Sequence, residues 1–172
     1  SLAARFPEMV GVGDDPSMPG LLHRIDSGTS GIVLCARSQA AFDAIRRQFT
    51  ARTVDKTYLA VVHGEVEKAG GVSGWLAHSS SFRGRMRCVG SASLPKGERA
   101  LFAETFYKPL RVRDGRTLLE VKITTGVTHQ IRCQLASLGH PIVGDATYGS
   151  DRPLDGPYGP RHLLHAAVLG FD

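Results

Sequence analysis

Cysteine and long apolar runs are scarce in this sequence of 172 residues, and each shortage excludes a class of protein. The three cysteines lie far apart, at positions 35, 88 and 133, so the spacing indicates neither a metal site nor a disulfide framework. The longest apolar stretch, residues 31–36, is far shorter than the roughly 20 residues that cross a bilayer. A basic start followed by an apolar segment, the mark of a signal peptide, is also missing. These features predict a cytoplasmic protein with reduced thiols and no membrane segment.

Acidic residues are outnumbered, with 16 Asp and Glu against 21 Lys and Arg, which gives a net charge of +5. Sixteen of the basic residues are Arg and only five are Lys. The planar guanidinium group of Arg meets two phosphate oxygens at once, which favours nucleic-acid binding. A genome rich in G and C would also raise the Arg content without a physical role. Composition leaves these two explanations even.

The rest of the composition is that of a globular protein. Hydrophobic residues make up 42% and charged residues 22% of the chain, and this length suits one domain of roughly 100–200 residues. Strand-like segments outnumber helical ones, and hairpin turns are frequent. The pattern therefore predicts an α+β fold: a single domain over residues 1–172 with a largely antiparallel mixed sheet, flanked by short helices and loops.

The expected strands and loops follow from apolar runs and from turn residues. Strands are predicted over residues 31–36, 57–63, 102–107 and 117–124, and the last segment, residues 163–171, is apolar again. Loops or turns are predicted over residues 1–20, 68–74, 113–115 and 151–160. Residues 78–97 are polar and basic, with Arg83, Arg85, Arg87 and Lys96, and are expected to form a hairpin or a mobile loop. This loop either grips phosphates or is merely solvated.

Two helices are expected, each after a residue whose hydroxyl group can cap it. Ser38 precedes a run in which Ala41, Phe42, Ile45 and Phe49 fall on one face. Thr128 precedes an apolar stripe of Ile131, Leu135 and Leu138, which Gly139 and Pro141 end.

Three stretches carry residues that a scaffold alone does not need. Asp26 lies in a Gly-flanked loop, Tyr58 lies on a predicted strand, and Arg132 lies in the first turn of a predicted helix, near amides that attract anions. Each has an ordinary explanation when taken alone. A loop Asp usually forms a turn, and a strand Tyr usually packs in the core or at its rim.

Together these stretches resemble the RluA-type pseudouridine synthase family. The family's His-Arg-Leu-Asp-x-x-Thr-Ser-Gly element is found at residues 23–31, with Ile25 in place of Leu. Its Lys-x-Tyr-x-Ala element matches residues 56–60, and its Gly-Arg-Thr-His-Gln-Ile-Arg element matches residues 126–132 except for Val127. Residues 139–145, 148–149 and 164–166 also resemble family text. The matches follow the family's order over residues 22–171.

The resemblance implies the pseudouridine synthase fold and a reaction that isomerises uridine in RNA, whether ribosomal or transfer RNA, to pseudouridine. Asp26 corresponds to the family's nucleophile, and the sequence leaves open whether it attacks the ribose or the uracil ring. Tyr58 and Arg132 correspond to the other catalytic residues, with Arg132 expected to grip Asp26 through a two-point fork. The residues expected to bind the RNA or the base are Arg24, Lys56, Thr29, His129 and Leu164. No cofactor or metal is needed, and a monomer is expected.

Some departures from the family pattern keep other interpretations open. The family's strand before the aspartate loop is not recognisable in residues 1–20, and relatives usually continue beyond Asp172, so a compact or truncated catalytic domain is expected. An inactive RNA-binding module of the same fold is the alternative, which Val127 favours and the intact Asp26, Tyr58 and Arg132 oppose. Leu164 fits a pocket wall and a core position equally. A hydrolase with paired carboxylates needs a second acidic partner that no neighbouring motif supplies.

Overall fold

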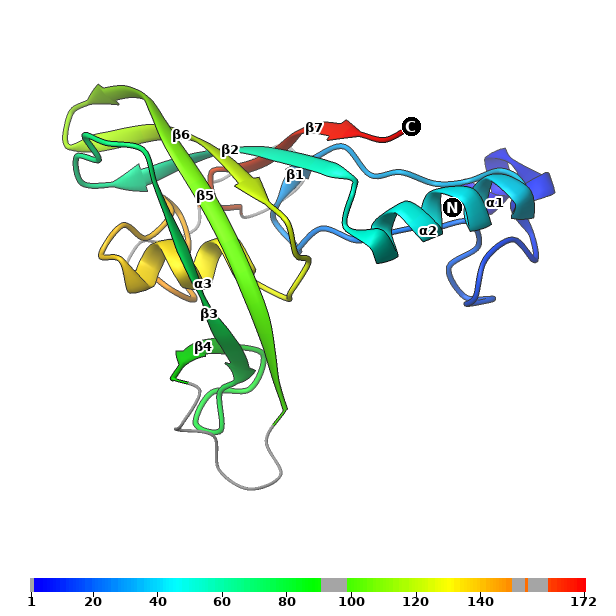
Figure 1. The fold of residues 1–172 in the computed structure, drawn as a ribbon, viewed down its shortest axis with the longest axis horizontal. Coiled ribbons are helices and arrows are strands. Elements are labelled where there is room, and N and C mark those ends of the chain that lie inside the picture. Colours follow the sequence, from blue (N-terminus) through cyan, green and yellow to red (C-terminus); the bar gives the residue numbers. More distant parts are fainter. Residues whose placement is uncertain (1, 91–98, 150–153, 155–160) are drawn as a thin grey trace.

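The computed structural model describes residues 2–90, 99–149, 154 and 161–172. Its main feature is a seven-stranded sheet with the order β1-β7-β2-β6-β5-β3-β4 (Figure 1). The strands are β1 (Ser30–Gly31), β2 (Asp55–His63), β3 (Gly70–His78), β4 (Met86–Val89), β5 (Ala100–Arg113), β6 (Arg116–Ile123) and β7 (Leu164–Gly170). Only β1 and β7 pair in parallel; the other neighbours are antiparallel. The predicted α+β fold with a largely antiparallel mixed sheet is confirmed.

Helices in the described residues are few and short. They are α1 (Leu2–Arg5), the 3-10 helix η1 (Pro7–Met9), α2 (Gln39–Ala51) and α3 (Gln130–Ser137). Figure 1 shows α3 against one face of the sheet and α2 beside the N-terminal segment, away from α3. None of the helices in this part of the chain is long and apolar enough to cross a membrane.

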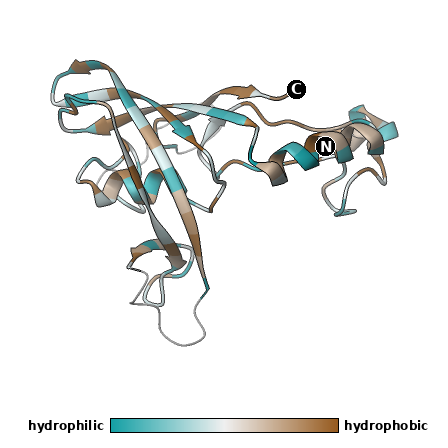
Figure 2. Cartoon of the chain, viewed as in Figure 1, coloured by the Kyte–Doolittle hydropathy of each residue, from teal (hydrophilic) through white to brown (hydrophobic). Residues whose placement is uncertain are grey.

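The main core forms between the central strands and α3. Alternate residues of β2 and β6 point to the same face, and Ala60, Val62, Leu119 and Val121 there are fully buried. Ile131 and Leu135 of α3 pack onto them, together with Leu164 of β7. Figure 2 shows hydrophobic residues interrupted by hydrophilic ones along β5, as expected for a strand with one face in solvent. The core thus fixes α3, and with it Arg132, relative to β2.

Two local predictions from residue chemistry are confirmed. The Ser38 side chain accepts a hydrogen bond from the Ala41 amide at 3.3 Å and caps α2, whose Phe42 is buried in a second cluster with Val12, Leu22 and Ala36. Between β5 and β6, Asp114 and Gly115 have φ angles of 50° and 65°. Two successive positive φ angles make the tight turn that suits the twist of a hairpin, and Gly adopts them at little cost.

Several predicted boundaries are wrong. Residues 1–20 are not all loop, since they include α1 and η1. The strand expected over residues 31–36 is limited to Ser30–Gly31, with one further bridge between Leu21 and Cys35. The turn expected at residues 68–74 is largely the start of β3. There Gly70 and Gly71 lie under the rings of Tyr107 and Phe106 on β5, so these glycines make room for aromatic side chains rather than a bend.

The predicted basic segment is a hairpin in its described part, because β4 pairs with β3. Lys96 and most of the predicted loop at residues 151–160 lie outside the described residues. The second helix begins at Gln130, after His129 with a φ of 55°, and not after a Thr128 cap. Leu138 is 40% exposed, so its apolar stripe is reduced to Ile131 and Leu135.

We predict that Gly31→Ala strongly destabilises the fold. Gly31 has a φ of +118°, and an added Cβ would lie 2.6 Å from the Ala166 amide nitrogen and press on the Ala166 carbonyl. Such a clash in the β1–β7 pair is expected to lower the free energy of unfolding by roughly 3 kcal/mol or more. Urea denaturation measures it. The matched control is Gly74→Ala, whose Cβ meets no atom within 4 Å; equal stability of the two variants would contradict the prediction.

Candidate active site

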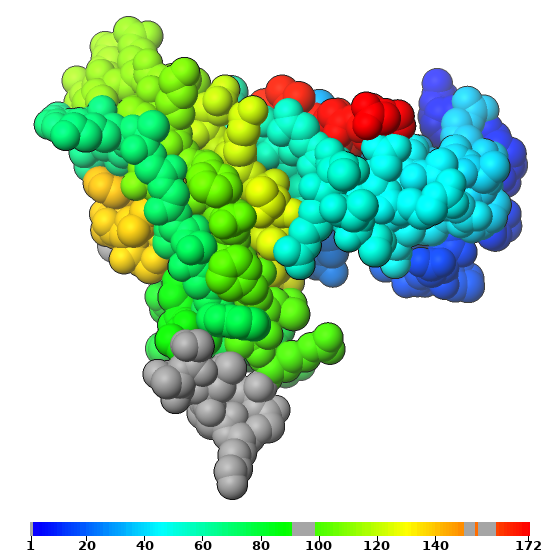
Figure 3. All heavy atoms as spheres, in the orientation of Figure 1, coloured from blue at the N-terminus to red at the C-terminus, as the bar shows by residue number. Residues whose placement is uncertain are grey.

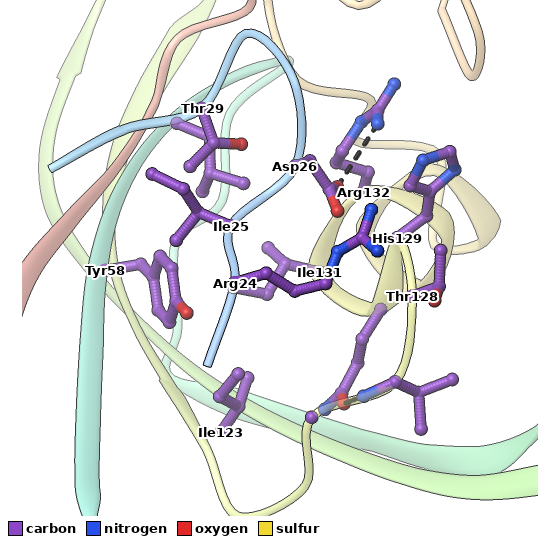
Figure 4. Close-up of a pocket in the computed structure, with 14 residues that line it drawn as sticks. Arg24, Ile25, Asp26, Thr29, Tyr58, Ile123, Thr128, His129, Ile131 and Arg132 are labelled. Carbon is purple, nitrogen blue, oxygen red and sulfur yellow. Dashed lines mark hydrogen bonds and ion pairs between the residues drawn. The ribbon is translucent and has the colours of Figure 1, made fainter. Parts of the chain in front are cut away.

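A pocket of about 130 Å³ lies where the loop before β1, strand β2 and the start of α3 meet. This volume is smaller than the roughly 300–1,000 Å³ of sites for drug-sized ligands, and it suits a single ring. The lining residues are Arg24, Ile25, Asp26, Thr29, Tyr58, Ile123, Gly126, Val127, Thr128, His129, Gln130, Ile131, Arg132 and Leu164 (Figure 4).

The structure brings together seven of the eight residues predicted from the sequence. Arg24, Asp26, Thr29, Tyr58, His129, Arg132 and Leu164 all line the pocket. Lys56 does not: its Nζ donates a hydrogen bond to the Thr125 carbonyl at 3.0 Å, and its side chain lines a neighbouring groove. Leu164 serves both of the purposes considered for it, since it lines the pocket and is buried in the main core.

The Asp26 loop is held by contacts on the C-terminal side of Asp26. The Thr29 amide donates to the Asp26 carbonyl at 3.0 Å, which closes a turn. The Thr29 hydroxyl contacts His162 Nε2 at 2.8 Å, and β1 then pairs with β7. These contacts fix the loop to the chain just before β7, and they leave the Asp26 side chain 22% exposed.

Arg132 connects Asp26 to a second carboxylate. Its Nη1 donates to Asp26 Oδ2 at 3.2 Å, while its Nε and Nη2 donate to the two oxygens of Asp145 at 2.7 and 2.9 Å. The Thr147 hydroxyl also accepts from Nη2. The expected two-point fork onto Asp26 is therefore wrong: the fork grips Asp145, and Asp26 receives a single hydrogen bond.

The residues around Asp145 explain why Arg132 pairs with it through two hydrogen bonds. Asp145 is fully buried, and its Oδ1 also accepts from the amides of Thr147 and Tyr148. A carboxylate with this many donors is held in one orientation, which matches the planar guanidinium. Arg132, with a side chain only 7% exposed, thus has its position set by Asp145 and offers its remaining edge to Asp26.

The charges of this group determine the pKa shifts. Burial by itself raises the pKa of Asp145, but the hydrogen bonds and positive charge of Arg132 outweigh it and hold the pKa below its ordinary value of 3.8. Burial likewise lowers the pKa of Arg132, and its hydrogen bonds and charge attraction with Asp145 and Asp26 more than compensate. Both groups are charged at neutral pH.

Tyr58 lies across the pocket on β2, and Figure 4 shows its hydroxyl pointing into the space between Arg24 and Ile123. Burial, and then the negative charge of Asp26, raises the pKa of Tyr58 above 10.0. Its hydroxyl is therefore protonated at neutral pH and can donate a hydrogen bond to a bound group. The exposed Arg24 extends across the pocket toward His129 and Thr128.

The comparisons with known proteins agree with this site. Residues 12–137 match the family model described as RNA pseudouridylate synthase. The chain belongs to this family. It is 35% identical over 158 residues to ribosomal large subunit pseudouridine synthase D of Zymomonas mobilis, covering 89% of this chain and 48% of the relative. The protein of that name from Nitrosomonas europaea is 37% identical over 156 residues, covering 87% of this chain and 43% of the relative.

Solved structures of the pseudouridine synthase family share the fold. Human RNA pseudouridylate synthase domain containing 1 has a TM-score of 0.74 and 32% identity, covering 98% of this chain and 66% of that one. Human RNA pseudouridylate synthase domain containing 4 has a TM-score of 0.70 and 26% identity, covering 88% of this chain and 66% of that one. These matches confirm the predicted RluA-type family. The chain spans about half the length of the curated relatives named above.

Three residues that support this site are not indicated by the sequence. Asp145 and Tyr148 lie in segments that resemble the family, but their positions in the sequence indicate no role, and no sequence motif marks His162. The Tyr148 hydroxyl accepts from the Met86 amide at 2.8 Å and contacts His129 Nδ1 at 3.0 Å. The full burial of Asp145 and the half-burial of Tyr148, which no sequence pattern reveals, are what make them important. Among the described residues, no three His, Cys, Asp or Glu side chains lie close enough to hold a metal ion.

We predict that Asp145→Asn destabilises the protein at neutral pH by roughly 3 kcal/mol, because it leaves the buried Arg132 without its main counter-charge. A carboxyl group with a lowered pKa stabilises the fold above its unfolded pKa, near 3.8, and loses that effect as the pH falls through the folded pKa. The difference between wild type and variant is therefore expected to be largest above about pH 4 and to shrink below it.

Urea denaturation over a pH series measures this difference. The control is Asp114→Asn, which removes a carboxylate from an exposed pair with Arg113 and is expected to change stability little. A gap between Asp145→Asn and wild type that stays constant from neutral to acid pH would contradict the assigned charge state of Asp145.

Proposed function

We propose that this chain is the catalytic part of an RNA pseudouridine synthase, which isomerises a uridine in RNA to pseudouridine. The observation that carries the proposal is the Asp26 carboxylate, which lies in a ring-sized pocket, receives a hydrogen bond from Arg132 and shares the pocket with Tyr58. The relatives are named for the ribosomal large subunit, which favours ribosomal RNA over transfer RNA as the substrate.

The target base has to leave the RNA stack to reach this pocket, because a stacked base hides its glycosidic bond. In the proposed mechanism, Asp26 acts as the nucleophile and forms a covalent intermediate, which divides one difficult substitution into easier steps. Its carboxylate bonds either to ribose C1′, as the C1′–N1 bond breaks, or to the uracil ring, as a ring double bond opens. In both routes the uracil is turned and rejoined to C1′ through C5, the C5 proton is lost, and the bond to Asp26 is broken. Arg132 keeps the carboxylate oriented through its hydrogen bond to Oδ2. Since Asp145 holds the guanidinium independently of Asp26, the orientation of Arg132 persists while Asp26 reacts.

Tyr58 is proposed to bind the uracil, and Arg24 is proposed to move aside when it enters. The Tyr58 ring forms one wall, and its protonated hydroxyl donates a hydrogen bond to the uracil rather than acting as an ionised base. Arg24 is exposed and crosses the pocket, so entry of a base displaces its side chain toward the RNA. Thr29 fixes the loop through His162, and His129 borders the entrance through its contact with Tyr148.

An inactive RNA-binding module is the weaker alternative. A protein that only binds RNA does not need a partly exposed carboxylate oriented by a buried guanidinium. This chain has such a pair in Asp26 and Arg132. Asp145 is a second carboxylate near Asp26, as a hydrolase with paired carboxylates would need. It is fully buried, both of its oxygens accept hydrogen bonds from Arg132, and it does not line the pocket, so it cannot reach a substrate there.

We predict that Asp26→Asn lowers the rate of pseudouridine formation by at least roughly a thousandfold, because the amide keeps the shape of the side chain but is a poor nucleophile. RNA affinity and thermal stability are expected to change little. Release of tritium from C5 of labelled uridine in RNA measures the rate, with Asp43→Asn, an exposed carboxylate on α2, as the control. Residual activity above about a tenth of wild type would remove Asp26 from this role.

A further inference from the structure

A second hollow of about 510 Å³ lies beside the active-site pocket. It is bounded by the C-terminal end of α2, by β3 and β5, and by the segment that follows β6. Figure 3 shows this face of the molecule hollowed between α2 and β5. Gly126 and Val127 line both hollows, so this one short segment forms a wall between them.

Two exposed aromatic rings line this groove. Trp75 on β3 and Phe102 on β5 are paired in register, and their rings meet edge to face at 5.7 Å and 72°. They are 38% and 40% exposed, respectively, although both are large hydrophobic side chains. Because the rings are steeply inclined to each other, the flat surface is the exposed face of a single ring, on which a nucleobase can stack while the other ring contacts the edge of that base.

Two cations stand at the same groove. Arg52 is the exposed C-cap of α2, in a left-handed conformation with a φ of 60°, and Lys56 is the second residue of β2. Both residues line the groove. Burial, and then the charge of Arg52, lowers the pKa of Lys56. Like charges held together without a carboxylate among the lining residues favour an anion such as phosphate. Glu104, further along β5, does not line the groove, and its carboxylate accepts from the Thr124 hydroxyl.

We propose that this stacking groove, formed by Arg52, Lys56, Trp75, Phe102, Gly126 and Val127, binds the nucleotide next to the target uridine in single-stranded RNA. The base stacks on the face of Trp75 and packs its edge against the ring of Phe102, and the phosphate lies near Arg52 and Lys56. The shared wall at residues 126–127 places the groove one step from the catalytic pocket. The inference rests on the proposed function and adds to it a site that selects unpaired RNA around the uridine.

Two features favour RNA over a protein segment as the occupant of the groove: the groove adjoins the catalytic pocket, and it is lined by two positively charged side chains. An apolar protein segment would use the aromatic rings but not the two cations, whereas a nucleotide uses both kinds of group. The net charge of +5 is of the same sign as the groove. Lys56, predicted as an RNA-binding residue, is thus assigned to the neighbouring nucleotide rather than to the uracil.

The test uses intrinsic fluorescence, because Trp75 is the only tryptophan of the chain. The full chain with Asp26→Asn, which prevents turnover, is titrated with a short unstructured oligoribonucleotide that contains one uridine. A matched oligoribonucleotide carries abasic sites on both sides of that uridine. Stacking on Trp75 is expected to quench its emission by about half with the intact RNA and only slightly with the abasic RNA. Equal quenching by the two RNAs, or none with either, would overturn the proposal.

A second measurement separates the groove from the catalytic pocket. In the otherwise wild-type chain, Phe102→Ala is expected to raise KM for the intact RNA roughly tenfold while kcat changes less than about twofold. Phe106→Ala removes an exposed aromatic ring on β5 outside the groove and serves as the control. Phe102→Leu, which keeps an apolar side chain without a π-face, guards against a folding defect; equal KM values for Phe102→Leu and wild type would contradict stacking.

The two proposals fail in different ways. If Phe102→Ala forms pseudouridine with an unchanged KM, the proposal that the groove binds a nucleotide is wrong, while the proposed enzymatic function stands. Base-dependent quenching without any pseudouridine formation by the wild-type chain would support the groove and overturn the proposed function.

Discussion

The site depends on one buried guanidinium. Arg132 forms four hydrogen bonds, to Asp145, Thr147 and Asp26, and these partners come from different parts of the chain. A charge at this depth is tolerated only when it is paired and its donors are used. The requirement to satisfy Arg132 therefore holds the loop after α3 and the Asp26 loop against the same helix.

The rest of the pocket follows from this constraint. The central sheet and α3 share a core, so the position of Arg132 is rigid relative to Tyr58 on β2. The Asp26 loop is fixed on its other side by the Thr29–His162 contact and by the β1–β7 pair. Asp26 is thereby placed between a rigid cation and an open pocket, which suits a carboxylate that has to be oriented and also reach a substrate.

The different burial of Asp145 and Asp26 gives these two carboxylates different roles. Asp145 is fully buried and neutralises Arg132, so it belongs to the framework. Asp26 has a single bond to Arg132 and some exposure, so it keeps lone pairs free. The stacking groove beside the pocket uses a different principle, in which exposed rings and cations receive a nucleotide, and the wall at residues 126–127 connects the two regions.

Much of the framework could be predicted from local residue chemistry. Apolar runs and turn residues predicted β2 and β6, the hydroxyl of Ser38 predicted the start of α2, and Asp114–Gly115 predicted the hairpin turn. Each of these depends on neighbours a few residues away, which a sequence displays directly. The start of α3 did not follow its expected cap, because the Gln130 side chain accepts from the Val127 amide and from Thr125 and ties down that segment instead.

The sequence by itself determined which residue types are present for the chemistry: a loop carboxylate, a strand tyrosine and a helix arginine in the order of the pseudouridine synthase family. The tertiary structure alone decided their partners. Asp26 and Arg132 are 106 positions apart, and the choice of Asp145 for the two-point fork depends on which carboxylate is buried. The same holds for Lys56, which lies two residues from Tyr58 but faces another hollow. Burial and long-range contact arise from packing of the whole chain, and no local pattern contains them.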